Sequence, residues 1–153
     1  MDWLFDLFRN PFLITAVSSW AIAQILKAGI NAVLQKKFSL ERLFGDGGMP
    51  SGHSATVSSL VVVTALTYGT DSFAFAISAI LAIIVCHDAM GVRQETGKQA
   101  VLLNEIVKSF SILTENTLPE VKLKEFVGHT PMQVLAGILL GIANGFFMYY
   151  IVL

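Results

Sequence analysis

Four apolar segments alternate with polar ones along the chain, covering residues 11–34, 54–70, 72–86 and 130–153. A membrane-crossing helix needs roughly 20 apolar residues, with a range of about 17–25. The first and fourth segments meet this length alone. The two middle segments reach it only with flanking residues such as His53 and His87. The pattern predicts an all-α fold, an integral membrane helical bundle of about four transmembrane helices.

Composition supports this prediction. The 153 residues are 54% hydrophobic and 14% charged, whereas a soluble domain carries about 25% charged residues. So few charges cannot cover a globular surface, which disfavours the alternative that the middle segments are buried helices of a soluble core. The length suits one membrane-embedded domain, residues 1–153. A net charge of −1 gives no electrostatic case for nucleic acid.

The polar stretch between the third and fourth segments contains further helical signals. Residues 99–113 have apolar positions at helical spacing, which predicts an amphipathic helix at the membrane surface or packed on the spans. Thr117 to Glu120 resembles a helix start, and Gly128 suits the end of that short helix.

Basic residues indicate an orientation in the membrane. With four spans, both basic loops fall on one side, and an excess of Lys and Arg marks the cytoplasmic side. We therefore expect a cell-membrane protein with both termini outside. The basic residues concerned are Lys36, Lys37, Arg42, Arg93, Lys98, Lys108, Lys122 and Lys124.

The fourth segment carries Gly137, Gly141 and Gly145, four residues apart. This spacing places them on one helix face, where small residues allow another helix to approach closely. Tight packing within the monomer is favoured over the alternative, a homodimer seam.

The chemically capable residues gather at the span ends on the basic side. Two spans also begin there, and helix N-termini favour phosphate. Lys27 lies inside a span, where a charge is costly unless it serves a polar cavity, although its stem can also snorkel to the interface. His53 and His129 titrate near neutral pH, and as a pair at two helix starts they favour catalysis over capping. The sequence thus predicts an anion site on the cytoplasmic side.

Three stretches resemble a known superfamily. GGMPSGHSA (47–55) resembles the second motif of the type 2 phosphatidic acid phosphatase superfamily, which includes the vanadium haloperoxidases. GHTPMQVLAGILLG (128–141) looks like the end of its third motif. DAMGVRQETGKQA (88–100), followed by LKEFVGHTP, is similar to a divergent acid phosphatase/haloperoxidase-related branch of small membrane proteins. The resemblance covers most of the chain.

The resemblance implies a mechanism without a metal or other cofactor. His129 matches the histidine that attacks phosphorus and forms a phosphohistidine, and His53 matches the acid that protonates the leaving oxygen. The matches to phosphate-binding groups are Lys27, Ser51, the Gly52 amide and Arg93.

The chain also departs from the superfamily pattern. The first motif lacks its Arg-Pro, and Arg93 precedes His129 by 36 positions where six are usual. Gln133 replaces the aspartate that orients the nucleophile, and it fits equally well in a capping box with Thr130. Asp88 either supplies the missing carboxylate or has a structural role, as a salt bridge to Arg93 or a helix-end contact. His87 has no counterpart and is interpreted as accessory or structural.

We expect a membrane phosphatase acting on a lipid phosphate or diphosphate, with isoprenoid and glycerolipid substrates fitting equally well. A catalytically inactive phosphate-lipid binding or scaffold protein is the main alternative. Phosphotransfer to another acceptor is a third possibility, and haloperoxidase activity is least favoured.

Overall fold

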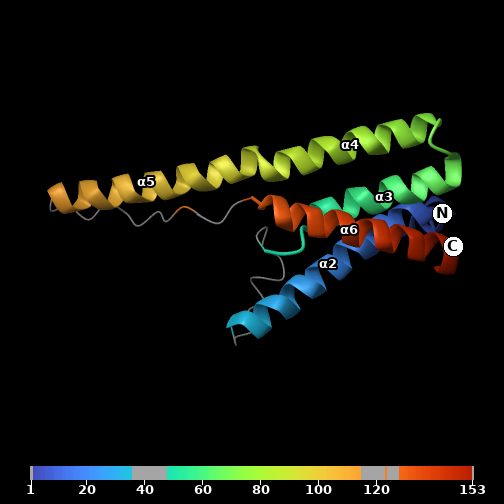
Figure 1. The fold of residues 1–153 in the computed structure, drawn as a ribbon, viewed down its shortest axis with the longest axis horizontal. Helices are drawn as coiled ribbons and strands as arrows, with labels where there is room; N and C mark the ends of the chain where they lie inside the picture. The colour runs from blue at the N-terminus through green and yellow to red at the C-terminus, as the bar shows by residue number, and fades with distance from the viewer. Residues whose placement is uncertain (1, 36–47, 115–122, 124–127, 153) are drawn as a thin grey trace.

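The structure is a computed structural model that describes residues 2–35, 48–114, 123 and 128–152 (Figure 1). Within these residues it contains helices and no strands, so the all-α prediction is confirmed. In chain order the helices are Asp2–Phe8 (α1), Pro11–Gln35 (α2), Gly52–Tyr68 (α3), Phe73–Met90 (α4), Val92–Thr114 (α5), Pro131–Phe147 (α6) and the π-helical turn Met148–Val152 (η2).

Short polar residues set the helix starts. The side chain of Asn10 accepts hydrogen bonds from the amides of Phe12 and Leu13 at the start of α2. Ser51, Ser72 and Thr130 are the N-caps of α3, α4 and α6. Each satisfies an amide that has no intrahelical acceptor. Local sequence therefore fixes where each helix of the bundle begins.

Helix α3 occupies the centre of the bundle and packs against α2, α4 and α6. The three glycines of α6 all face α3. A Cβ atom at Gly137 or Gly141 would lie closer than 3.0 Å to the carbonyl oxygen of Ser51 or Ala55, and one at Gly145 would lie 2.7 Å from Val62 Cβ. The structure thus shows tight packing within the monomer. The structure does not show a homodimer seam through these glycines, because α3 covers them.

A polar contact joins α6 to α2 inside the bundle. The side-chain nitrogen of Asn144 lies 2.7 Å from Ser19 Oγ, 3.0 Å from Ser18 Oγ and 3.3 Å from the carbonyl oxygen of Thr15. The hydroxyl of Ser59 on α3 also approaches the Thr15 carbonyl, at 3.4 Å. Such interhelical hydrogen bonds are typical of membrane helices.

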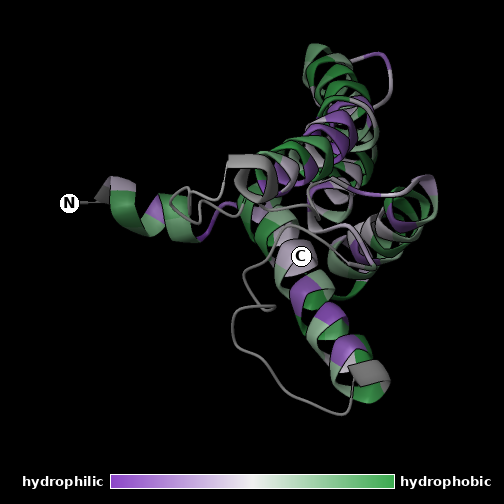
Figure 2. Cartoon of the chain, turned by 90° about the vertical axis from the view of Figure 1, so that its left-hand side faces the viewer, coloured by the Kyte–Doolittle hydropathy of each residue, from purple (hydrophilic) through white to green (hydrophobic). Residues whose placement is uncertain are grey.

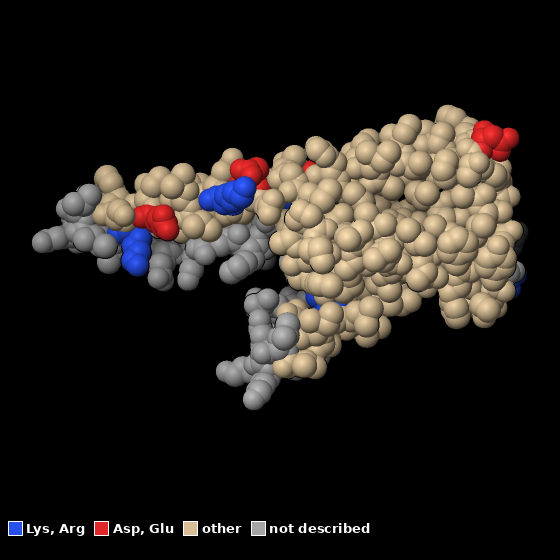
Figure 3. All heavy atoms as spheres, in the orientation of Figure 1, with Lys and Arg blue, Asp and Glu red and all other residues tan. Residues whose placement is uncertain are grey.

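The bundle is polar and small inside and apolar outside. Ile25 and Ile83 are each 69% exposed. This is the reverse of a soluble protein and matches the small, polar interfaces between membrane helices. Charged atoms are sparse on the bundle face of Figure 3 and occur along α5 and at the ends. Fully buried residues are Thr15, Ser19, Ala23, Ser51, Ser54, Ala55, Ser59 and Val63.

Three described helical stretches are long and apolar enough to cross a membrane: Pro11–Val33, Phe73–Phe110 and Pro131–Val152. Four spans were expected. The difference is α3, whose 17 residues measure about 26 Å at 1.5 Å per residue, somewhat less than the roughly 30 Å of a bilayer core. It lies among the other three helices.

Helix α5 continues α4 after the single residue Gly91 and extends away from the bundle (Figure 1). The amphipathic helix expected at 99–113 falls within it but begins seven residues earlier, at Val92. Among the residues that the structure describes, α5 does not pack on α2, α3 or α6, and a membrane-surface position stays a prediction. Asn104 binds the backbone of Leu123 through both its oxygen and its nitrogen. The short helix expected from Thr117 lies outside the described residues.

The two ends of the bundle differ. Both chain termini lie at the end where α3 connects to α4 (Figure 1), and α1 points away from the bundle there (Figure 2). Helix α4 ends, and α3 and α6 begin, at the opposite end. The candidate functional residues thus lie far from the termini. Which end faces the cytoplasm stays a prediction.

Candidate functional site

Two histidines form the centre of the site. His53 is in the first turn of α3, and His129 comes two residues before α6. Their ring centroids are 6.1 Å apart, with ring planes at 85°. His129 is 2% exposed, while His53 is half-buried. The structure thus brings together two motifs that are about 75 residues apart in the chain.

Backbone contacts hold the starts of α3 and α6 together. The Ser51 amide donates to the carbonyl oxygen of Gln133 at 3.0 Å. Gly137 packs on the carbonyl of Ser51 one turn further along. The two helices therefore run side by side from the site, and both N-termini point to the same end of the bundle.

The end of α4 and the start of α5 position the backbone of His129. Its amide donates to the carbonyl oxygen of Ala89 at 3.0 Å. Gly128 has a φ of +94°, and a Cβ atom there would lie 2.7 Å from the carbonyl carbon of Arg93. Only glycine fits both the conformation and the contact. This contact brings the backbone of Arg93 next to the residue before His129, although Arg93 and His129 are 36 positions apart in the sequence.

Arg93 forms a salt bridge with Asp88, Nε to Oδ2 at 2.9 Å, and both side chains are about 40% exposed. Of the two roles open for Asp88, the structure shows this one. A carboxylate contact to His129 is not among the contacts described. The guanidinium of Arg93 carries four further N–H groups on its Nη atoms, the geometry that grips phosphate oxygens.

Lys27 is 2% exposed. Its stem lies against the backbone of the segment that leads into α3, where a Cβ atom at Gly48 would be 3.2 Å from Lys27 Cγ. A buried lysine does not snorkel to solvent, so the structure disfavours that alternative. Lys27 belongs to the same end of the bundle as the histidines.

Ser51 is fully buried. Its hydroxyl oxygen accepts from the Ser54 amide at 3.4 Å and from the Ser54 hydroxyl at 3.1 Å, so it caps α3. Gly52 is the first residue of the helix, where amides lack intrahelical acceptors. That these two residues bind phosphate stays a prediction.

Gln133 completes a capping box with Thr130. Its side-chain oxygen accepts from the Thr130 amide at 3.1 Å, and its own amide donates to Thr130 Oγ1 at 3.4 Å. Of the two roles open for Gln133, the structure shows capping. At the position of the superfamily's nucleophile-orienting aspartate, this chain therefore has a helix-capping side chain.

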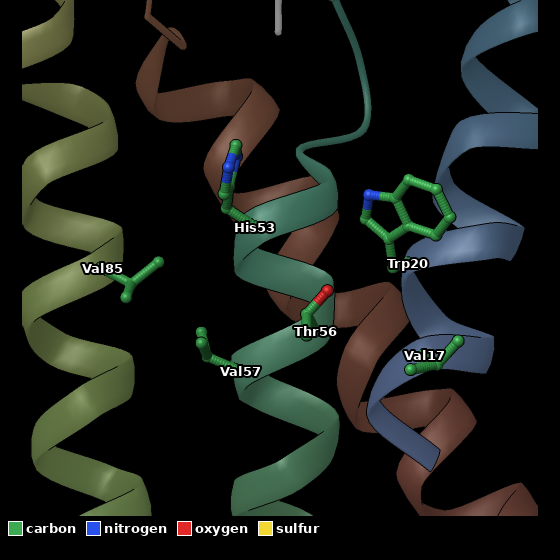
Figure 4. A pocket seen from close by; sticks show the side chains of 6 residues that line it. All are labelled: Val17, Trp20, His53, Thr56, Val57 and Val85. Carbon is green, nitrogen blue, oxygen red and sulfur yellow. The ribbon is translucent and has the colours of Figure 1, made fainter. Parts of the chain in front are cut away.

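Sequence reasoning missed a cavity of about 330 Å³ beside His53. It lies between α2, α3 and α4 (Figure 4). Trp20 contributes to it and packs near Gly52. The available signal was its position seven residues before Lys27, which puts both on one face of α2. The lining residues are Val17, Trp20, His53, Thr56, Val57 and Val85.

The parts of the chain described here contain no group of three or more His, Cys, Asp or Glu residues that could hold a metal ion. The groups near the site are histidines, an arginine, a lysine and two helix N-termini. Such a set binds anions. A reaction independent of metal stays a prediction.

Comparison with known proteins identifies the family of the chain. The profile of the Divergent PAP2 family matches residues 8–144. The chain is 37% identical over 146 residues to the "uncharacterized membrane protein YuiD" of Bacillus subtilis (strain 168), covering 90% of this chain and 92% of that protein. No solved structure matches it. The resemblance read from the motifs is confirmed: the chain is a membrane protein that belongs to the Divergent PAP2 family.

Proposed function

We propose that this protein hydrolyses the phosphate ester or diphosphate of a membrane lipid. His129 attacks the terminal phosphorus, the P–O bond to the lipid alcohol (or, in a diphosphate, to the lipid monophosphate) breaks, and His53 gives its proton to the leaving oxygen. Water then attacks the phosphohistidine, with His53 accepting a proton from it, and phosphate leaves. The observation that carries the proposal is the 6.1 Å separation of the two rings, which lets one phosphoryl group contact both.

The surroundings support an anionic transition state. The N-termini of α3 and α6 point to the same end, so their partial positive charges add. Lys27 and Arg93 lie at that end and carry full positive charges. Donors fixed in place before the reaction stabilise developing charge effectively, because they need not reorganise.

The bundle's apolar exterior supports a lipid substrate. The site lies at one end of helices whose outer surfaces are covered by large apolar side chains. A lipid in the surrounding bilayer has its phosphate at the same level as a helix end. The phosphate can therefore reach the histidines from the side while its chains stay in the membrane.

Phosphate release from purified protein in detergent tests the proposal, with isoprenoid and glycerolipid phosphates as substrates and EDTA present. We expect release by the wild type, inhibition by vanadate, and loss of at least a hundredfold in kcat for His129→Ala and His53→Ala. His87→Ala is the matched control, because His87 is an exposed histidine near the end of α4. Equal release by all three variants would overturn the proposal.

One observation favours a second candidate, a protein that binds lipid phosphates without turnover. The two side chains expected to orient His129 have other partners, because Asp88 pairs with Arg93 and Gln133 caps α6. Wild-type protein that binds lipid phosphate but releases none would establish this candidate instead.

A further inference from the structure

We infer that the cavity beside His53 is the seat of the substrate's hydrocarbon chain, and that it selects a lipid whose single chain is bonded directly to the phosphate oxygen. The ligand is an alkyl or prenyl monophosphate rather than a diacylglycerol phosphate. This inference rests on the proposed function, since it takes His53 as the acid for the leaving oxygen.

The cavity lies next to the bond that the proposed reaction breaks. His53 is part of its lining, and the ring of His53 also faces that of His129. A lipid with its phosphorus at His129 and its leaving oxygen at His53 therefore has its first carbon atoms at this cavity. Apolar surface occurs all over the bundle, but this cavity adjoins the proposed acid.

The lining is polar only at the end nearest the start of α3. In Figure 4 the imidazole of His53 and the indole nitrogen of Trp20 lie at that end, while Val17 and Val57 lie further along the helices. The remaining polar lining residue is Thr56, and its hydroxyl donates to the carbonyl oxygen of Gly52 at 2.8 Å. Beyond the first turn, the cavity thus offers a chain mainly aliphatic contacts.

This distribution of polar groups distinguishes the two lipid classes. A diacylglycerol phosphate carries two ester groups within a few bonds of its phosphate. In this cavity the lining offers the two esters one indole N–H, that of Trp20, since the Thr56 hydroxyl already donates to Gly52. At least one ester would therefore leave water without a donor, and an unsatisfied acceptor costs about tenfold or more in affinity. An alkyl or prenyl phosphate has no acceptor beyond its phosphate, so its chain enters without that cost and gains affinity from each buried methylene.

Binding measured independently of turnover tests the inference. Trp3→Phe removes one of the two tryptophans, at a position 67% exposed in α1, and leaves Trp20 as the reporter. The probe is a hexadecyl phosphonate with bromine on its chain, which quenches nearby indole fluorescence and has a C–P bond that is not hydrolysed. A brominated diacylglycerol phosphonate of similar chain length is the comparison.

We expect the single-chain phosphonate to bind at least tenfold more tightly than the diacyl phosphonate. Val17→Phe and Val85→Phe narrow the cavity from α2 and α4 and should each weaken single-chain binding at least tenfold. Ile77→Phe is the matched control. It lines a separate apolar cavity of about 410 Å³ with Phe12 and Tyr68 and should change affinity less than twofold.

The inference would be overturned if the two phosphonates bound with equal affinity, or if neither valine substitution weakened binding of the single-chain phosphonate. Phosphate release by the same preparations separates it from the proposed function. Binding with the expected selectivity but no release leaves the cavity assignment standing and refutes hydrolysis. Release without selectivity refutes the cavity assignment and leaves hydrolysis standing.

Discussion

Gly141→Ala tests the contact between α3 and α6 on which the histidine pair depends. A Cβ atom at this position would lie 2.9 Å from Ser58 Cβ and 3.0 Å from the Ser59 amide nitrogen, and closer still to the Ala55 carbonyl. Two of these atoms belong to the backbone of α3 and cannot rotate away. Relief requires the helices to separate by several tenths of an ångström, and overpacking of this kind costs about 1–3 kcal/mol.

The substitution also stabilises the helix itself, and this gain must be separated from the packing cost. Alanine is about 1 kcal/mol better than glycine within a helix. Gly29→Ala provides this gain alone, because a Cβ atom at Gly29 meets nothing within 4 Å. Both changes add one methyl group to a helical glycine, so the difference between their free energies of unfolding isolates the packing cost, expected at about 1–3 kcal/mol.

Unfolding by SDS in mixed micelles, followed by tryptophan emission, measures both variants. We expect Gly29→Ala to unfold at a higher SDS fraction than the wild type and Gly141→Ala at a lower SDS fraction than Gly29→Ala. Equal shifts for the two variants would refute close packing of α6 on α3 at this glycine.

Three further predictions concern the site and its frame. Gly128→Ala puts a side chain at a φ of +94° and against Arg93, which should displace His129 and lower kcat/KM for lipid phosphate at least tenfold; an unchanged value would contradict the assigned contact. Asp88→Asn removes an exposed ion pair, so we expect a stability change of about 0–1 kcal/mol and less than a tenfold fall in kcat. A thousandfold fall would instead indicate that Asp88 orients the nucleophile His129. Asn144→Leu removes the polar contact between α6 and α2 and should destabilise the bundle by about 1–2 kcal/mol in the SDS titration, and no loss would show that this contact contributes nothing.

The fold was largely predictable because its signals are local. Thr130 and Gln133 mark a helix start within four residues of sequence, and the glycine spacing of α6 marks a contact face. Both bounds of α3 were placed two residues too late: the apolar run covers residues 54–70, whereas Ser51 caps a helix that starts at Gly52, and Gly69, with a φ of +82°, ends it at Tyr68.

The site was predictable only in part because its geometry depends on distant segments. The pairing of His53 with His129 followed from the motifs. The contact between Gly128 and Arg93 did not, since it depends on where α5 starts relative to the return of the chain to α6. Trp20 was missed because one aromatic residue in an apolar helix looks like any other lipid-facing side chain.

The glycine face of α6 has a consequence for the tolerance of the protein to its surroundings. Most helix pairs are separated by a layer of side chains, which can repack when the bilayer thickens, thins or changes composition. At Gly137 and Gly141 that layer is absent and the main chain of α6 meets that of α3, while Gly145 packs directly on the side chain of Val62. The spacing of the two backbones that carry the histidines is therefore set by direct helix contact rather than by the rotamers of side chains between the helices. Lipid-facing positions such as Ile83 and Leu139 can vary in size without altering it.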